Sequence, residues 1–475
     1  MSERAKSTQH YDLVALGGGT GGLVAAAGGA YLGLRTAIVE KHALGGDCLW
    51  TGCVPSKALI ASARLARRMS RAAGLGLAPG GERHDFRAVM ERVRAARATV
   101  AHHDDPERFR EMGVGVHFGA ARFLDPNTVE VEGEGTLRAK RFVVATGAVP
   151  AIPPIPGLAD ADYWTYETVF DENELPGSVA IMGGGPIGVE FAQVFARLGS
   201  KVAILEMMPS ILVREDPDVA AFMHGLLEAE GIEIRTGAAV SGVRSENGGT
   251  VVETDDGGRI AVERVFVATG RRPCTEGLDL EAAGIRTERG AVVVDSRLRT
   301  TSKSAWGVGD VTGALQFTHV AEQMAKVALR NSVLPVKTKI RYDSVPRVTF
   351  TDPEVAHIGM SEAEAEAAGG TTYRYGMDDL DRAIVDGSAV GFVKISADRK
   401  GRVIGATILA HGAGDLIMPL VLAKTHGLSL SRVNGTIYPY PTMVEGVKRA
   451  SGEYMRSRLD TASGRILKRV IQWLK

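Results

Sequence analysis

At 475 residues the sequence is long enough for roughly three or four domains, and its 45% hydrophobic content is ordinary for a globular protein. Lys plus Arg and Asp plus Glu number 56 each, so no overall charge attracts nucleic acid or an anionic membrane. The opening MSERAKSTQHYD lacks the apolar run and cleavage site of a secretory signal, and we expect a cytoplasmic protein without a transmembrane segment.

Two segments repeat the same pattern of strand, glycine turn, helix and strand. They are DLVALGGGTGGLVAAAGGAYLGLRTAIVEK, residues 12 to 41, and SVAIMGGGPIGVEFAQVFARLGSKVAILEM, residues 178 to 207. In register, Gly17, Gly19, Gly22 and Glu40 of the first copy align with Gly183, Gly185, Gly188 and Glu206 of the second. Such glycines permit a tight turn, a close pyrophosphate and close helix packing, while the acidic residue receives ribose hydroxyls. We therefore predict an α/β protein with two Rossmann-like dinucleotide-binding units.

The stretch GGDCLWTGCVPSK, residues 45 to 57, holds two of the three cysteines. Pro55 suits the first turn of a helix, so Cys53 lies at a helix N-terminus, where the helix dipole favours a thiolate. An ideal helix would separate Cys48 from Cys53 by about 7.5 Å of rise, so a disulfide requires an irregular turn, which Gly52 can supply. In a cytoplasmic protein we expect a redox pair rather than a structural staple, and no zinc spacing accompanies it.

Each unit is closed by an apolar run that ends in Ala-Thr-Gly. The runs are RFVVATGAVP, residues 141 to 150, and ERVFVATGRRP, residues 263 to 273. Glu206 also bears on the nicotinamide cofactor, because a carboxylate favours the free 2′-hydroxyl of NAD, whereas a 2′-phosphate would require an Arg. Met207 and Met208 follow instead. We therefore expect NAD(H) rather than NADP(H).

Together with GGGPIGVE, VGDV and PTMVE, the cysteine motif resembles the class I FAD-dependent pyridine nucleotide-disulfide oxidoreductases, among which mercuric reductases and dihydrolipoamide dehydrogenases are similar. The resemblance spans nearly the whole chain. It implies an FAD-binding domain in two parts, residues 1–150 and 276–345, around an NAD(H)-binding domain of residues 151–275. It also implies a C-terminal α+β interface domain, residues 346–475, that forms a homodimer and lends residues to the partner's active site.

The resemblance also implies roles for individual residues. Electrons would pass from NAD(P)H through the flavin to a Cys48–Cys53 disulfide, with Cys53 as the charge-transfer thiolate and Cys48 as the interchange thiol. Lys57 and Glu190 would form an ion pair beside the flavin, where a cation stabilises the reduced ring. The cofactor-binding residues expected from the repeats and the resemblance are Gly17, Gly19, Gly22, Glu40, Gly46, Lys57, Thr146, Gly147, Gly309, Asp310, Gln316 and His319 for FAD, and Gly183, Gly185, Gly188, Glu190, Glu206 and Gly270 for the nicotinamide cofactor.

The motif YPYPTMVEG departs from the disulfide-reducing members, in which a His acts as acid and base immediately before Pro-Thr. Here Tyr440 takes that place, five residues before Glu445, which could bond the phenol. Ionising a Tyr of pKa near 10 at pH 7 requires about 4 kcal/mol, against under about 1 kcal/mol for a His. The motif resembles that of mercuric reductases, in which a Tyr also replaces the His. Their substrate is a metal ion, which, unlike a disulfide, needs no proton. Their terminal vicinal cysteines and CxxC module are absent from this sequence.

The acceptor therefore stays open between a metal ion, quinone or other small oxidant, which we favour, and a lipoamide-type disulfide. A non-catalytic, redox-sensing flavoprotein is the third alternative. Smaller signals point to structure: Cys274 reads as an inert core thiol, and Asp105 before Pro106 as a helix N-cap rather than a metal ligand. The tail GRILKRVIQWLK forms an amphipathic helix that we expect to dock on the protein itself rather than on a membrane.

Overall fold

The first repeat builds a parallel five-stranded sheet whose strands come from three distant parts of the chain. We describe a computed structural model over residues 8–80, 84–246, 248–460 and 462–475, which leaves out most of the N-terminal stretch considered for a signal. The strand order is β21 (Ala305–Gly307), β8 (Phe142–Val144), β2 (Leu13–Leu16), β3 (Thr36–Glu40) and β4 (Val114–Phe118). Helices α1 (Thr20–Tyr31) and α8 (Thr318–Val333) pack together in the apolar core beside the sheet. The sheet is thus completed by a strand from beyond the second repeat.

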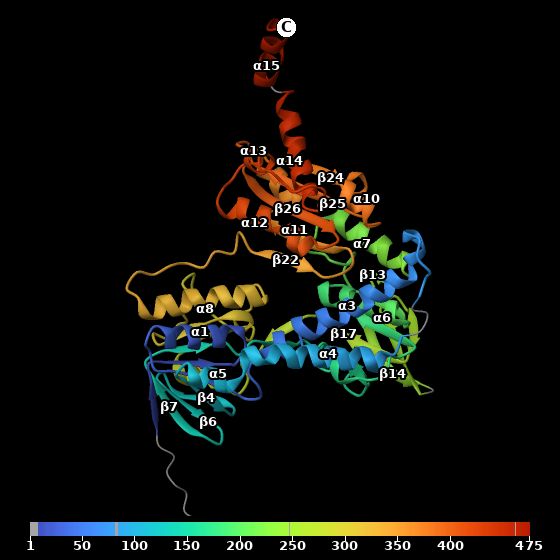
Figure 1. Cartoon of the computed structure of the whole chain (residues 1–475). Helices are drawn as coiled ribbons and strands as arrows, with labels where there is room; N and C mark the ends of the chain where they lie inside the picture. Colours follow the sequence, from blue (N-terminus) through green and yellow to red (C-terminus); the bar gives the residue numbers. More distant parts are fainter. Residues whose placement is uncertain (1–7, 81–83, 247, 461) are drawn as a thin grey trace, which may run out of the picture.

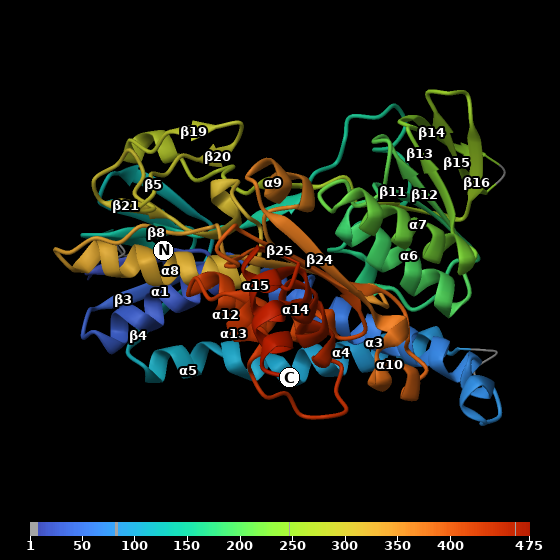
Figure 2. The same ribbon diagram turned by 90° about the horizontal axis from the view of Figure 1, so that it is seen from above.

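The second repeat forms an equivalent parallel sheet, seen on the right of Figures 1 and 2. Its order is β10 (Tyr163–Trp164), β17 (Arg264–Val267), β11 (Ser178–Met182), β12 (Lys201–Glu206) and β13 (Glu233–Thr236), with helix α6 (Pro186–Leu198) between β11 and β12. Strands β2 and β11 are almost wholly buried, which explains their continuous apolar sequences. The predicted duplication is confirmed.

The glycines of the two copies adopt matching conformations. Gly17 and Gly183 have φ of +106° and +107°, a region that side chains other than hydrogen disfavour. A Cβ on Gly22 would lie 1.9 Å from the Gly17 carbonyl oxygen, and one on Gly188 would lie 1.9 Å from that of Gly183. Only glycine therefore allows each helix to approach its strand so closely.

Smaller sheets and helices complete the two units. The strands are β1 (Gln9–Tyr11), β5 (Ala121–Asp125), β6 (Thr128–Val131), β7 (Gly135–Ala139), β9 (Ala148–Pro150), β14 (Val240–Glu246), β15 (Gly249–Thr254), β16 (Arg259–Val262), β18 (Arg271–Pro273), β19 (Thr287–Glu288) and β20 (Ala291–Val292). The helices that concern the cysteines are α2 (Gly46–Trp50), α3 (Cys53–Ser70) and α4 (Phe86–Ala101). Asp105 caps α5 (Pro106–Glu111) by accepting the Glu107 amide at 2.8 Å, as predicted. Strands β9 and β18, which follow the two Ala-Thr-Gly runs, pair with each other.

The C-terminal part contains an antiparallel sheet that lies above the two parallel sheets in Figure 1. Its order is β22 (Pro346–Thr349), β23 (Glu354–Gly359), β26 (Val403–Ala410), β25 (Phe392–Ala397) and β24 (Thr371–Gly376). The helices of this part are α9 (Glu362–Ala367), α10 (Asp381–Val385), α11 (Ala413–Leu416), α12 (Met418–Thr425), α13 (Leu430–Asn434) and α14 (Glu445–Arg458). The buried sheet residues and helices share one apolar core.

A buried lysine joins this domain to the second parallel unit. Lys394 on β25 is 3% exposed, and its ammonium lies 2.8, 2.7 and 2.8 Å from carboxylate oxygens of Asp216, Asp218 and Glu362. Asp216 and Asp218 stand at the start of α7 (Pro217–Ala229). The three carboxylates cluster as metal ligands would, but the ammonium is their counter-ion. The cluster therefore fixes one domain on the other.

The last helix, α15 (Ala462–Trp473), contradicts our expectation that it docks on its own chain. It continues outward from α14 and projects away from the domains (Figure 1). Its apolar residues from Ile466 to Leu474 are between 46% and 84% exposed. The reason is that α14 carries the chain out of the domain, so the apolar side chains of the helix stay exposed among the described residues. Within the described residues, no helix combines the length and apolar content needed to cross a bilayer.

Replacing Lys394 by Met should lower the free energy of unfolding by about 3 kcal/mol, because three carboxylates lose their buried counter-ion. Urea unfolding followed by circular dichroism measures the change. Lys400→Met, at an exposed turn, is the matched control and should change stability by less than about 0.5 kcal/mol. Equal stability of the two variants would contradict the interdomain role of Lys394.

Candidate active site

The acidic residue that ends the second strand of each repeat is held by its own glycine loop. Glu40 accepts the Gly18 amide at 2.7 Å, and Glu206 accepts the Gly184 amide at 2.6 Å. The second oxygen of each carboxylate accepts an amide two residues further on, from His42 at 2.9 Å and Met208 at 2.8 Å. Both carboxylates are thereby oriented at the carboxyl edge of their sheet, where dinucleotides bind.

The first glycine loop has the shape that a flavin dinucleotide requires. Gly19 precedes α1, and a Cβ on Gly46 would lie only 2.7 Å from the Gly19 Cα, so two backbone segments meet where no side chain fits. The N-terminal amides of α1 face this point, which suits a pyrophosphate. The residues present therefore fit FAD.

Of the other residues predicted for FAD, Thr146, Gly147 and Gly309 follow strands of the first parallel sheet. Thr146 and Gly147 follow β8 and are hydrogen-bonded to Cys274. The Thr146 hydroxyl donates to the Cys274 carbonyl at 2.6 Å, and the Cys274 amide donates to the Gly147 carbonyl at 3.0 Å. Gly309, with φ of +76°, follows β21. His319 in α8 contacts the Pro346 carbonyl at 3.0 Å, and burial lowers the pKa of its imidazole.

Asp310 has a partner that the sequence did not reveal. Arg271 donates to its carboxylate at 2.6 Å, to Asp47, and to the Tyr166 hydroxyl at 3.0 Å. Burial raises the pKa of both the Asp47 and Asp310 carboxyls, against the attraction of the Arg271 guanidinium. Arg271 thus bridges the two dinucleotide units, and one of its partners, Asp47, directly precedes Cys48 in the chain. The sequence offered one signal for this role: Arg271 directly follows Gly270, at the end of a predicted strand.

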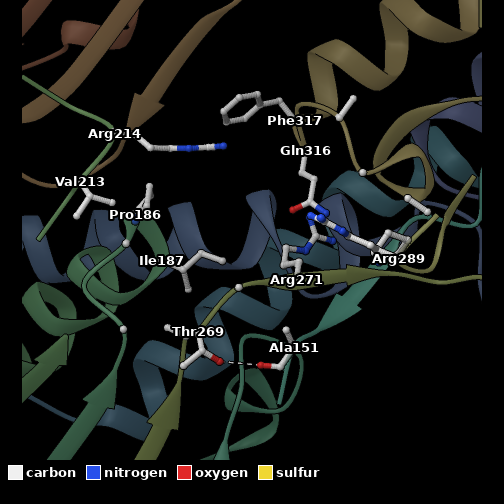
Figure 3. A pocket seen from close by; sticks show the side chains of 18 of the residues that line it. Ala151, Pro186, Ile187, Val213, Arg214, Thr269, Arg271, Arg289, Gln316 and Phe317 are labelled. Atoms are coloured by element: carbon white, nitrogen blue, oxygen red, sulfur yellow. Dashed lines mark hydrogen bonds between the residues drawn. The ribbon is translucent and has the colours of Figure 1, made fainter. Parts of the chain in front are cut away.

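A cavity of about 1730 Å³ opens between the second glycine loop and the central segment. Gly183, Gly185 and Glu206 line it together with Gly270 and Gln316. In Figure 3 the side chains of Arg214, Gln316, Arg271 and Arg289 reach into it, and a 2.7 Å bond from Thr269 to the Ala151 carbonyl closes its floor. Ordinary small-molecule sites enclose about 300 to 1,000 Å³, so this one has room for a dinucleotide. Gln316 therefore lies with the nicotinamide-side residues.

The cysteine pair sits in the irregular turn that the sequence predicted. Gly52, with φ of −115° and ψ of −108°, separates α2 from α3, and its amide bonds the Asp47 carbonyl at 2.5 Å. The turn brings Cys48 and Cys53 into hydrogen-bond contact. Cys53 is exposed and Cys48 is half-buried. The pair is thus placed for reversible disulfide formation.

Several groups favour the anionic form of Cys53. A hydrogen bond from Cys48, helped by Thr318 and by the Lys57 ammonium, lowers the pKa of Cys53 to about 6. The pKa of Cys48 is raised, because its proton is shared with the Cys53 sulfur. Thr318 Oγ1 lies 3.4 Å from Cys53 Sγ at the start of α8, so two helix N-termini face this sulfur. Sequence reasoning missed Thr318, although it lies between Gln316 and His319, which were both predicted to bind FAD.

The predicted ion pair between Lys57 and Glu190 is confirmed, with Lys57 Nζ 3.0 Å from the carboxylate. Lys57 projects from α3 and Glu190 from α6, so the pair joins the two repeats. The other Glu190 oxygen accepts the Phe350 amide at 2.7 Å, and the Lys57 ammonium lies 4.4 Å from the Phe350 ring centroid. Phe350 was not foreseen, because it enters from the C-terminal domain. Its position shows that all three domains converge on this ion pair.

Tyr440 and Glu445 do not meet as the sequence suggested. Tyr440 is 69% exposed on the loop after α13, and a hydrogen bond with Asp381 raises the pKa of its phenol. Glu445 is buried in the first turn of α14. Asp381 replaces Glu445 as the phenol's partner because the loop carries Tyr440 toward α10. Exposed apolar residues surround this outer surface, namely Ile384, Val385 and Ile437.

Comparison with known proteins covers nearly the whole chain. Residues 11–325 match the pyridine nucleotide-disulphide oxidoreductase family, and residues 345–451 match its dimerisation domain. The chain is 35% identical to mercuric reductase of Streptomyces lividans, over 93% of this chain and 95% of that protein. It is 34% identical to dihydrolipoyl dehydrogenase of Thermus scotoductus, over 93% and 96%. The HOCl-induced flavoprotein disulfide reductase RclA of Escherichia coli, solved as a Cu(II) complex, superposes with a TM-score of 0.85 at 30% identity, over 94% and 99%.

Alkylation of the reduced protein by iodoacetamide should proceed at Cys53 with a midpoint near pH 6, because only the thiolate reacts. Peptide mass spectrometry from pH 4 to 9 measures the rate at each cysteine. Cys48→Ala should move the Cys53 midpoint upward, since the hydrogen bond to the thiolate is lost. Cys274 is the internal control, because burial raises its pKa. A Cys53 midpoint above pH 8 would contradict this description.

Proposed function

The chain belongs to the pyridine nucleotide-disulphide oxidoreductase family, and from this premise we propose that it oxidises NADH and reduces a metal ion, quinone or other small oxidant through FAD and the Cys48–Cys53 pair. Family membership establishes an FAD-dependent oxidoreductase that uses NAD(P)H. Within that class, the choice of acceptor depends on the chemistry at the cysteines and at Tyr440.

FAD, when bound, would transfer the two electrons of the nicotinamide hydride to the disulfide. The Cys48–Cys53 bond then breaks with uptake of two electrons and one proton, which leaves Cys48 as a thiol and Cys53 as a thiolate. The low pKa of Cys53 supports this distribution, since the proton stays on Cys48. Lys57, held by Glu190, supplies a fixed positive charge beside this thiolate.

The observation that carries the choice of acceptor is that residue 440 is a tyrosine, exposed on its loop, where disulfide-reducing relatives are expected to have a histidine. Its phenol bonds an acidic side chain, which raises its pKa, so at neutral pH it can donate a hydrogen bond but cannot remove a proton. A disulfide substrate needs protons to be moved during exchange with the thiols. A metal ion coordinated by thiolates needs none, and soft thiolates suit Hg(II) and copper. The mercuric reductase relatives and the Cu(II) complex of RclA support this class of acceptor.

A homodimer completes the proposed site. The dimerisation-domain match covers the loop that carries Tyr440, and the exposed Ile437 and Tyr440 give that loop an apolar surface for a second copy. Tyr440 would then act across the interface, on the partner's cysteine pair, while the buried Glu445 supports the loop from within its own domain. We also propose that the protein is cytoplasmic.

Lipoamide-type activity is the second candidate, supported by the dihydrolipoyl dehydrogenase relatives at similar identity. The two candidates differ in one testable respect, which is the need for a base at position 440. A redox-sensing flavoprotein without rapid turnover is the remaining alternative.

Steady-state NADH oxidation by the flavin-loaded protein at pH 7 should be faster with Cu(II), Hg(II) or a quinone than with lipoamide. Cys48→Ser is the control and should abolish the thiol-dependent part. Tyr440→His should raise lipoamide turnover by about tenfold or more, because an imidazole restores the base. Rapid lipoamide turnover by the unmodified protein, unchanged by Tyr440→His, would instead identify a disulfide-reducing enzyme.

Glu206 should give a preference for NADH over NADPH of about tenfold or more in kcat/KM, since its carboxylate repels a 2′-phosphate. Glu206→Gln keeps an acceptor for the Gly184 amide but loses the charge, and it should reduce this ratio. Glu228→Gln, on the exposed side of α7, is the matched control. Equal use of both nucleotides by the unmodified protein would overturn this assignment.

A further inference from the structure

The helix α15 separates apolar and cationic residues onto opposite faces. Ile466, Val470 and Leu474 recur at intervals of four, with Leu467, Ile471 and Trp473 beside them, so they form one apolar stripe. The opposite side carries the cations Arg465, Lys468 and Arg469, Lys475 follows the helix, and residues 462 to 475 include no Asp or Glu. The chain as a whole has balanced charge, so this cationic surface is a local feature.

The apolar stripe is exposed to solvent rather than packed on the chain. Ile466 is 61% exposed, Val470 46% and Trp473 84%, in a helix that stands clear of the domains (Figure 1). Burying such residues is normally favourable, so a row of them on one free helix indicates an external partner. The dimerisation-domain match ends at residue 451, so α15 lies beyond the segment associated with dimer formation.

The charge pattern identifies the kind of partner. A continuous apolar stripe, a polar side rich in Lys and Arg, and a Trp among the apolar residues are typical of helices that lie in a lipid interface. The Lys468 ammonium lies 3.2 Å from Asp460, but both groups are exposed, so this pair is weak and can give way to lipid phosphates. Twelve residues span about 18 Å, against about 30 Å of bilayer hydrocarbon, so the helix would lie along the surface.

We propose that α15 is a peripheral anchor that binds the surface of a membrane containing anionic phospholipid, with Ile466, Val470, Ile471 and Leu474 among the acyl chains and Arg465, Lys468, Arg469 and Lys475 facing the phosphates. Because the helix projects from α14, it can lie flat without moving the domains that hold the cysteines. This anchoring is independent of the electron acceptor.

Co-sedimentation of the flavin-loaded, full-length protein with vesicles tests the proposal. The protein should sediment with mixed phosphatidylcholine and phosphatidylglycerol vesicles at low salt, and remain in the supernatant with pure phosphatidylcholine. Raising the salt to about 1 M should release it, because screening then acts within about 3 Å. Trp473 adds a second readout: its exposed indole should shift its emission to the blue on binding, and this shift should be lost in Trp473→Phe.

Matched variants distinguish the two faces of the helix. Ile471→Glu and the double variant Lys468→Glu/Arg469→Glu should each weaken vesicle binding by about tenfold or more. The controls are Val336→Glu and Lys303→Glu/Lys339→Glu, at exposed positions on the body, and they should bind like the unmodified protein. Flavin content and NADH oxidation in solution should be equal in all variants, so failure of anchoring is separable from failure of the proposed reaction.

Two outcomes would overturn the proposal. The first is a failure of the vesicle assay: either the unmodified protein stays in the supernatant with anionic vesicles at low salt, or the Ile471→Glu variant still sediments with them. The second is a dimer that dissociates on light scattering when residues 460–475 are removed, together with no vesicle binding by the full chain. That result would assign α15 to contact between copies.

Discussion

The ion pair between Lys57 and Glu190 is the contact on which the arrangement of the site depends. Lys57 lies one turn into the helix that begins at Cys53, while Glu190 lies on the glycine-loop helix of the second repeat. The Phe350 amide and ring, from the C-terminal domain, hold the carboxylate and cover the ammonium. Moving any of the three domains would disturb the charge beside Cys53. The pair therefore holds the three domains in fixed relative positions, and it also favours the Cys53 thiolate.

The internal duplication explains how one chain can serve two dinucleotides. Both copies use the same glycine conformations and the same carboxylate held by its own loop, yet they differ in what surrounds them. The first copy faces the cysteine turn, and the second faces the large cavity. Arg271 connects them by binding Asp47 and Asp310, which lie on the flavin side. Electron transfer between two sites needs such a fixed spacing, and the chain provides it with charged contacts that bridge the domains.

The sequence predicted the features that depend on local spacing. The glycine loops, Glu40, Glu206, the irregular turn at Gly52 and the helix beginning at Cys53 all follow from short-range patterns. The contacts of Thr318, Phe350 and Arg271 could not be predicted, because each joins residues far apart in the chain. The expected bond between Tyr440 and Glu445 was wrong for the same reason, since the loop places the phenol beside Asp381. The docking of the last helix was also wrong, because amphipathicity indicates a partner without identifying it.

Counting the thiols released by NADH tests the central claim most directly. The oxidised, flavin-loaded protein is incubated without oxygen with one equivalent of NADH, alkylated, and analysed by peptide mass spectrometry. If electrons reach this pair, Cys48 and Cys53 are protected before NADH and alkylated after it, while the labelling of Cys274 does not change. Full reduction of the flavin, over the same time, without new thiols at Cys48 and Cys53 would contradict the passage of electrons to this pair.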